Sequence, residues 1–458
     1  MSVLIAARRG LRVVPLETVD AAALPACRRR LSAAQRRWLD ASGFDARSGA
    51  VALLADARGG LIRVLAGVAR EDSLWALGGL ARQLPAGAYA LAPEGVLADA
   101  RLAVLGFVLG AYRYTRYHGG PERAPASLVV AQPLLDELAP LLEAAARVRD
   151  LVNTPTEDLG PEQLAAEVRA LGKQHGARLR EWVGEDLLKH NFPTIHAVGR
   201  ASHRAPRLVE LRWGKDRHPH LVLLGKGVCF DSGGLDLKPA DGMRWMKKDM
   251  GGAAHALALA ELVMRARLPV RLTLLIPAVE NAVSGNALRP GEVIRTRASH
   301  TVEIDNTDAE GRLILCDALT YAGEQQPDLI IDFATLTGAA RVALGPDLPA
   351  LFGNRDALRE AVLAASRNEH DPLWPLPLWR PYRRMLDSYL ADFANSGPSR
   401  HAGAITAALY LERFVPEATP WLHVDVYAWN DADRPGRPRG GEAQGLRAFF
   451  SFLRERYR

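Results

Sequence analysis

Near-continuous runs of apolar residues alternate with helical segments over the last two-thirds of the chain, and this alternation limits the fold more than any other feature. Strands that are buried on both faces read as unbroken apolar runs, whereas strands with one solvated face alternate apolar and polar residues. The apolar runs occupy residues 221–224, 272–276, 329–333 and 422–426. Between them, apolar residues recur at helical spacing, as at 253–266 and 313–322. The sequence therefore predicts an α/β protein with a mostly parallel central sheet covered by helices on both faces.

The length of 458 residues exceeds what one ordinary core accommodates and predicts two domains. Residues 1–130 carry short apolar runs, such as 51–54 and 61–65, separated by Gly and Pro, which is typical of a small N-terminal α/β domain. Helical spacing then continues until Pro155, so we expect a connecting helix within residues 131–155. Residues 156–458 form the larger C-terminal domain in this prediction.

Composition excludes several classes of protein. No apolar stretch of about 18 residues is free of charge, so we expect no membrane span. Arginines follow the short N-terminal apolar patch instead of preceding it, which is the wrong order for a secretory signal. Cys27, Cys229 and Cys316 are too few and too scattered for a disulfide framework or a thiolate zinc site, which favours a cytoplasmic location. The formal charge of +6 is dispersed among 52 acidic residues, so we do not expect nucleic-acid binding.

The sequence Asn-Thr-Asp-Ala-Glu-Gly-Arg-Leu at residues 306–313 places two carboxylates and a guanidinium at alternate positions. In an extended backbone, Asp308, Glu310 and Arg312 would face the same side. Two acids that converge on one point repel each other unless a proton or a cation lies between them. We therefore predict a bound metal ion at this octapeptide.

Other polar residues follow the predicted strands, where sites form in open α/β sheets. Residues 221–224 lead into a glycine-rich segment that contains Lys226 and Asp231, and Lys238 and Asp249 come next along the chain. Together with the two acids of the octapeptide, these residues provide four carboxylates, enough for two divalent ions about 3.5 to 4 Å apart. The glycine-rich segment matches neither a Walker motif nor a GxGxxG fingerprint, and it contains no GxSxG elbow.

Lysine is scarce in this chain, which has seven lysines against 51 arginines, and four of the seven lie within residues 226–248. An ammonium group that is buried near a cation can lose its proton and donate a lone pair, which a guanidinium effectively cannot do. Lys226 and Lys238 are therefore candidates for roles that need an amine. We interpret Lys247 and Lys248 as residues that end a solvated turn.

These residues lie in blocks that resemble the signature sequences of the leucyl aminopeptidase family (peptidase family M17), in that family's order over roughly residues 150–430. The blocks are GKG at 225–227, FDSGG at 230–234, KP at 238–239, DMGGA at 249–253, SGNA at 284–287, the octapeptide at 306–313 and TLTGA at 335–339. The resemblance implies that residues 156–458 form a two-metal peptidase domain that releases N-terminal amino acids from peptides.

The resemblance also implies a set of metal ligands. One tightly bound ion would be held by Lys226, Asp231, Asp249 and Glu310. A second, exchangeable ion would be held by Asp231, Asp308 and Glu310, with the main-chain carbonyl of Asp308. Lys226 must then be neutral, which burial near a dication would enforce. The expected metals are Zn²⁺ or Mn²⁺, with Mg²⁺ or Co²⁺ as alternatives.

Catalytic and substrate-binding roles follow from the same resemblance. Lys238 and Arg312 correspond to the family's catalytic pair, in which Lys238 stabilises the oxyanion and Arg312 anchors a bicarbonate that serves as general base. Asp249 would lie near the α-amine of the substrate. The residues that match the first-residue pocket are Met246, Thr335, Leu336 and Gly338. The apolar character of this pocket implies a preference for Leu-like or Met-like first residues.

Among the departures from the family pattern, Asp-Val-Tyr-Ala-Trp-Asn at 425–430 replaces the usual Asp-Ile-Ala-Gly, which bears on the fine shape of the substrate groove. The resemblance further implies a homohexamer of two stacked trimers. Two other functions stay open: a nucleic-acid-binding accessory role on the same scaffold, and a binding protein with a degenerate site, against which the complete ligand set argues.

Overall fold

The computed structural model describes residues 3–71, 73–119 and 125–458, which fall into two compact units. The first unit comprises Met1–Ala146 and Asn430–Gly440, and the second comprises Arg147–Trp429 and Gly441–Arg458. The division falls inside helix α5 (Gln132–Asn153), which occupies the segment where the connecting helix was expected.

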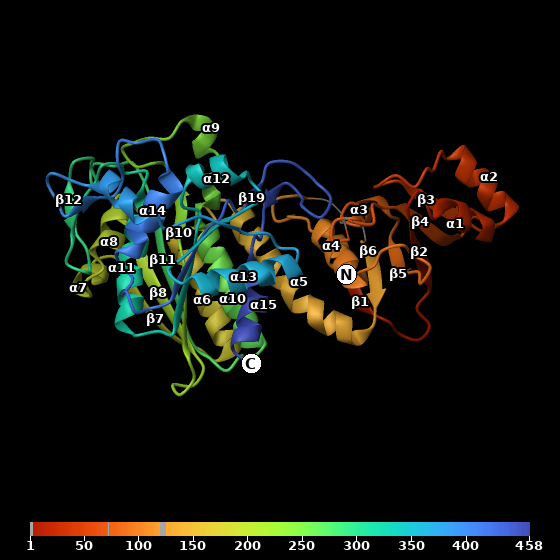
Figure 1. Cartoon of the computed structure of the whole chain (residues 1–458), viewed down its shortest axis with the longest axis horizontal. Coiled ribbons are helices and arrows are strands. Elements are labelled where there is room, and N and C mark those ends of the chain that lie inside the picture. Colours follow the sequence, from red (N-terminus) through yellow and green to blue (C-terminus); the bar gives the residue numbers. More distant parts are fainter. Residues whose placement is uncertain (1–2, 72, 120–124) are drawn as a thin grey trace. The chain divides into compact units, whose positions relative to one another are not determined.

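The first unit contains a six-stranded sheet with the strand order β1-β6-β5-β2-β4-β3 (Figure 1). Neighbouring strands are parallel except β3 and β4, which pair antiparallel. The strands are β1 (Leu4–Ala6), β2 (Val13–Val19), β3 (Val51–Ala55), β4 (Leu61–Gly67), β5 (Gly87–Leu91) and β6 (Ala126–Val130). Besides α5, the helices are α1 (Leu24–Arg30), α2 (Ala33–Ala41), α3 (Leu80–Gln83) and α4 (Ala100–Ala111). The predicted small N-terminal α/β domain is confirmed.

The second unit is built on a nine-stranded sheet with the order β16-β15-β18-β14-β9-β11-β8-β7, in which β10 also pairs with β11. The strands are β7 (Arg178–Val183), β8 (Arg207–Trp213), β9 (His220–Gly225), β10 (Gly227–Asp231), β11 (Arg271–Asn281), β14 (Leu329–Ala334), β15 (Ala350–Gly353), β16 (Trp374–Pro375) and β18 (Trp421–Asp425). The central strands β18, β14, β9, β11 and β10 are parallel, and antiparallel pairs flank them. Strands β9 and β14 are buried along their whole length, as their near-continuous apolar sequences predict.

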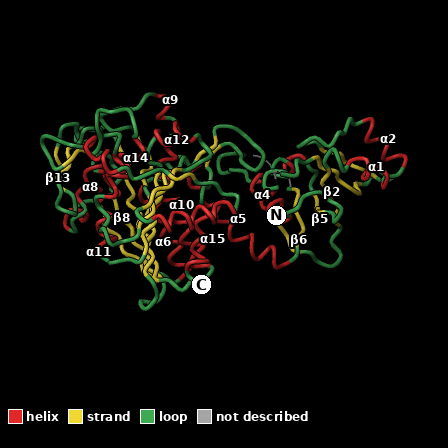
Figure 2. The backbone as a smooth tube through the Cα atoms, viewed as in Figure 1, coloured by secondary structure: helices red, strands yellow, loops and turns green. Residues whose placement is uncertain are grey.

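Helices pack on both faces of this sheet (Figure 2). One layer contains α6 (Pro161–His175), α10 (Gly251–Arg265), α13 (Asp356–Asn368) and α15 (Leu446–Arg456). The other contains α8 (Pro193–Gly199), α11 (Glu310–Glu324) and α14 (Gly403–Glu412). The fold class expected from the sequence is therefore confirmed.

Short elements complete the chain. They are α7 (Asp186–Lys189), α9 (Ala240–Met243), η1 (Met246–Met250), β12 (Val293–Arg295), β13 (Thr301–Glu303), α12 (Gly338–Leu344), η2 (Arg380–Leu386), β17 (Phe393–Ala394), β19 (Trp429–Asn430) and β20 (Gly440–Gly441). Among the described residues, no helix has both the length and the apolar character needed to span a membrane.

The expectation of an extended backbone at residues 306–313 is wrong. Asp308 lies in a turn, and Glu310 is the first residue of α11. The first half of α11 is buried on all sides, with Leu313, Ile314 and Leu315 fully buried, and an acid at a helix N-terminus, such as Glu310, is stabilised by the helix dipole. The glycine-rich segment after β9 also differs from a simple loop, because residues 227–231 form the second strand β10 and Asp231 ends it.

Candidate active site

A cavity of about 460 Å³ lies in the second unit where the central parallel strands end. Lys226 follows β9, Asp231 ends β10 and Thr335 follows β14, so three strand ends contribute side chains to it. The predicted site residues that line the cavity are Lys226, Asp231, Lys238, Met246, Asp249, Asp308, Arg312, Thr335, Leu336 and Gly338. Glu310 is the remaining predicted residue and is buried, with 1% of its surface exposed. The structure thus brings together residues that are more than 100 positions apart in the sequence.

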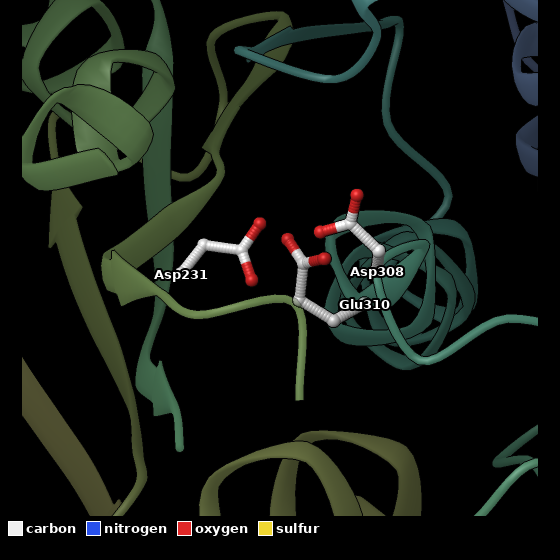
Figure 3. Close-up of side chains that lie close together, drawn as sticks. All are labelled: Asp231, Asp308 and Glu310. Atoms are coloured by element: carbon white, nitrogen blue, oxygen red, sulfur yellow. The ribbon is translucent and has the colours of Figure 1, made fainter. Parts of the chain in front are cut away.

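Three carboxylates converge beside this cavity. One oxygen atom from each of Asp231, Asp308 and Glu310 lies within 4.8 Å of the other two. The three side chains point toward one another, Asp231 from the end of β10, Asp308 from the turn before α11 and Glu310 from the first residue of α11 (Figure 3). Burial, together with the charge of Asp231, raises the pKa of Glu310 to about 8 and that of Asp308 to about 6. The convergence predicted from the octapeptide is therefore present, although a turn and a helix produce it.

Two lysines form ion pairs with the carboxylates of this site. Lys226 Nζ lies 2.7 Å from Asp249 Oδ2 and 2.9 Å from Glu310 Oε1. Lys238 Nζ lies 2.8 Å from Asp231 Oδ2 and also pairs with Asp308. Burial favours the neutral amine at both lysines, but the surrounding carboxylates outweigh it and raise the pKa of each. Without a bound cation Lys226 is therefore an ammonium ion, whereas a ligand role requires its neutral amine.

The residues at this site fit divalent metal ions. Among the described residues, Glu310 Oε2 is buried and has no hydrogen-bond partner, a situation that costs about 1–3 kcal/mol unless a cation or a proton compensates it. Four carboxylates with one amine form a donor set of oxygen and nitrogen atoms that Zn²⁺ and Mn²⁺ both accept. Gly311 lets the Lys226 side chain pack directly against the start of α11, because a Cβ atom at position 311 would lie 2.6 Å from Lys226 Cε.

Other residues orient the predicted ligands. Thr335 Oγ1 donates a hydrogen bond of 2.7 Å to Asp249 Oδ1, and Asn281 Nδ2 donates one of 2.8 Å to Asp231 Oδ1. Asp425 at the end of β18 accepts hydrogen bonds from the backbone amides of Leu336 and Thr337 and from the Thr337 hydroxyl, which fixes the loop after β14. Sequence reasoning missed Asn281 and Asp425 as site residues, although both lie at strand ends, as Asp231 does.

Arg312 lies in the first turn of α11, lines the cavity and forms no ion pair among the described residues. Its Nη1 atom donates a hydrogen bond of 2.6 Å to the backbone oxygen of Asn395, and its buried Nε has no partner among those residues. Burial lowers the pKa of this guanidinium. Asn395, 83 positions away, thus holds the Arg312 side chain, and the Nε atom of Arg312 keeps an unused hydrogen-bond donor among the described residues.

The interpretation of Lys248 as the end of a solvated turn is wrong. Its side chain is buried, lines the cavity and lies 5.0 Å from the centre of the Tyr427 ring. Burial lowers the pKa of Lys248 to about 8. Lys247 is half-buried and donates a hydrogen bond of 2.6 Å to the backbone oxygen of Asn153. Lys248 belongs to η1, a 3₁₀ helix whose last residues, Lys248 to Met250, are all buried in the unit.

Comparison with known proteins gives the same family for both halves of the chain. The catalytic domain of the cytosol aminopeptidase family matches residues 146–450, and the N-terminal domain of M17 aminopeptidases matches residues 14–130. A probable cytosol aminopeptidase of Syntrophotalea carbinolica is 41% identical over 384 residues, covering 80% of this chain and 77% of the relative.

Solved structures agree over almost the whole length. The cytosol aminopeptidase of Coxiella burnetii has a TM-score of 0.95 and 47% sequence identity, covering 99% of each chain. The bottromycin maturation enzyme BotP in complex with Mn has a TM-score of 0.87 and 34% identity, covering 97% of this chain and 99% of that one. A mutant of tomato leucine aminopeptidase has a TM-score of 0.84 and 27% identity, covering 98% of this chain and 95% of that one.

Proposed function

The chain belongs to the cytosol aminopeptidase family and is a metalloaminopeptidase, and on this premise we propose that it releases N-terminal amino acids from peptides by two-metal hydrolysis. One observation carries the proposal: four carboxylates gather around Lys226 and Lys238 beside a cavity of about 460 Å³. Acidic groups so close together need compensating cations, and a cavity next to them gives a substrate access to those cations.

For the ligands we propose the assignment that the family resemblance implies. Lys226, Asp231, Asp249 and Glu310 would hold one ion, and Asp231, Asp308 and Glu310 would hold the second, with the Asp308 carbonyl. Bound divalent ions supply Lewis-acid polarisation of the peptide carbonyl and acidify water at neutral pH. We propose Zn²⁺ or Mn²⁺ as the native metals, with Mg²⁺ or Co²⁺ as alternatives, and the manganese complex of BotP supports this choice.

The chain's own cationic residues complete the chemistry. The Lys238 ammonium lies at the cavity wall, where it can donate to the carbonyl oxygen as that oxygen gains negative charge. Arg312 offers its unpartnered Nε, and a small anion such as bicarbonate bound there would accept a proton from the attacking water.

Substrate selection would take place in the same cavity. We propose that the α-amine of the peptide lies at Asp249, so that only a chain end fits. Met246, Thr335, Leu336 and Gly338 would surround the first side chain. Their apolar surface supports a preference for Leu-like or Met-like first residues.

We also propose a homohexamer in the cytoplasm; the family resemblance supports the hexamer, and the name of the cytosol aminopeptidases supports the location. No finding favours the alternative of a nucleic-acid-binding accessory role. The proposed function is tested by assaying leucine p-nitroanilide hydrolysis before chelation, after chelation, and after addition of Mn²⁺ or Zn²⁺. We expect activity to be lost and then restored, and activity that ignores the chelator would refute the two-metal mechanism.

A further inference from the structure

Two cationic side chains share the ring of Tyr427 at the wall of the cavity. Lys248 Nζ lies 5.0 Å from the ring centre, and Arg341 Cζ lies 4.7 Å from it. Both residues line the cavity together with Tyr427. The side chain of Lys248 is buried, with 6% of the residue exposed, whereas Arg341, on α12, is exposed. The cavity therefore has one wall with two positive charges.

Among the described residues, neither cationic side chain has an ion pair or a hydrogen bond. The nearby acids are already engaged, because Asp249 pairs with Lys226 and Asp425 accepts hydrogen bonds from the loop after β14. A buried ammonium without a counter-charge is costly, and contact with an aromatic face recovers only about 0.5–2 kcal/mol. The two cationic side chains therefore lack a counter-charge from the protein, and an anionic group could reach them from the cavity.

The position of Lys248 connects this wall to one part of the substrate. Lys248 lies on η1 between Met246, proposed to contact the first side chain, and Asp249, proposed to receive the α-amine. A group that reaches Lys248 and Arg341 from there belongs to the side chain of the first residue. The apolar residues Met246 and Leu336 can still accommodate a leucine. The cationic wall would therefore let the pocket accept a second class of substrate side chain besides the apolar one.

We propose that Lys248 and Arg341 bind the side-chain carboxylate of an acidic first residue, Asp or Glu, so that the enzyme accepts acidic as well as apolar N-termini. This inference rests on the proposed aminopeptidase function. The same charges repel Lys and Arg at the first position, which makes the wall a device for rejection as well as acceptance.

The test compares substrates on the metal-loaded enzyme. We would measure kcat/KM for the p-nitroanilides of glutamate, leucine and lysine with the wild type and with Lys248→Met, Arg341→Gln and Lys247→Met. Lys248→Met keeps an unbranched side chain that is one atom shorter and removes its charge. Lys247→Met is the matched control, because it makes the same change in the neighbouring residue, which does not line the cavity.

We expect Lys248→Met to lower the glutamate-to-leucine ratio of kcat/KM by about tenfold or more and to raise the lysine-to-leucine ratio, since a bond to a charged group is lost. Arg341→Gln should act in the same direction by a smaller factor, and Lys247→Met should leave both ratios unchanged. Leucine hydrolysis that persists with unchanged ratios in both cavity variants would overturn the inference and leave the proposed function intact. If the metal-loaded wild-type enzyme itself does not hydrolyse leucine p-nitroanilide, the proposed function is refuted instead.

A second arm identifies which carboxylate binds. We would compare hydrolysis of Leu-Gly and Leu-Gly amide by the wild type and by Lys248→Met. Equal changes for the two peptides support the first-residue assignment. A selective loss with Leu-Gly would show that the wall binds the C-terminal carboxylate of a dipeptide, which would overturn the assignment to the first side chain.

Discussion

The Nζ atom of Lys226 lies 2.9 Å from Oε1 of Glu310, which joins the residue after strand β9 to the first residue of helix α11. Both groups are buried, and the same lysine also pairs with Asp249. Removing one partner of a buried ion pair is strongly destabilising, whereas replacing both partners by apolar residues is often neutral. The presence of the pair in the interior therefore points to a role beyond stability. We interpret the pair as the centre of the metal site.

Replacing Glu310 by Gln should remove metal and activity together. The amide keeps the size of the side chain and loses the negative charge that both proposed ions share. We expect less than about one metal ion per chain and a loss of kcat by a factor of about 1,000 or more. Elemental analysis of the purified variant and leucine p-nitroanilide kinetics would check this. Full metal content in a folded Glu310→Gln variant would remove Glu310 from the ligand set.

The protein stripped of metal should lose stability as pH rises. In the folded chain the pKa of Glu310 is raised to about 8 and that of Asp308 to about 6, from ordinary values of 4.5 and 3.8. The folded state therefore binds more protons than the unfolded state between about pH 4 and pH 8, and its free energy of unfolding falls as pH rises through this window. Thermal unfolding in EDTA at several pH values would measure the decline.

The matched comparisons sharpen this pH prediction. Added Mn²⁺ should remove the decline, because bound cations require deprotonated carboxylates. Glu310→Gln should make it shallower, since one of the two titrating groups is gone. Stability of the stripped wild type that rises from pH 5 to pH 8 would contradict the assignment of these two groups.

Lysine at position 238 should not be replaceable by arginine. The Lys238 ammonium fits between Asp231 and Asp308, and the larger planar guanidinium cannot occupy the same point. Because the group is proposed to act on the developing oxyanion, Lys238→Arg should lower kcat by about 100-fold, with metal content unchanged. The control is Lys189→Arg, because Lys189 forms an exposed ion pair with Asp186 on the surface, and this variant should keep full activity. Wild-type kcat in Lys238→Arg would refute the need for an amine.

The start of α10 depends on a glycine that permits close backbone contact. A Cβ atom at Gly252 would lie 2.1 Å from the backbone oxygen of Phe333 on β14. Gly252→Ala must therefore separate helix from sheet, and we expect a loss of about 1–3 kcal/mol in the free energy of unfolding. Gly285→Ala, where a Cβ atom meets nothing within 4 Å, should change stability little. Urea unfolding of the two variants would separate these outcomes.

Much of the fold was predictable because buried strands and helices require apolar residues at characteristic spacings in the sequence. The near-continuous apolar runs became β9, β11, β14 and β18, and the helical spacing at 253–266 became α10. The carboxylate Asp231 was a candidate because sites of this fold class form where parallel strands end, and it does end β10. Local patterns of this kind carry information over a few residues, and these features are local.

Features that depend on distant contacts could not be predicted. Nothing near Arg312 indicates that Asn395 holds it, since the contact spans 83 residues. The burial of Lys248 results from the packing of η1 and from Tyr427, a residue far along the chain. The alternate charges at 308, 310 and 312 fit a strand as well as a turn followed by a helix, and only the packing of α11 decides between them.

The central claim is that this site holds two divalent ions that together support peptide hydrolysis. The most direct measurement is a titration of fully chelated enzyme with Mn²⁺, in which bound metal per chain and leucine p-nitroanilide hydrolysis are recorded on the same samples. We predict saturation at about two ions per chain, with most of the activity returning as the second ion binds. Full activity at about one ion per chain, or before any ion is bound, would contradict the account.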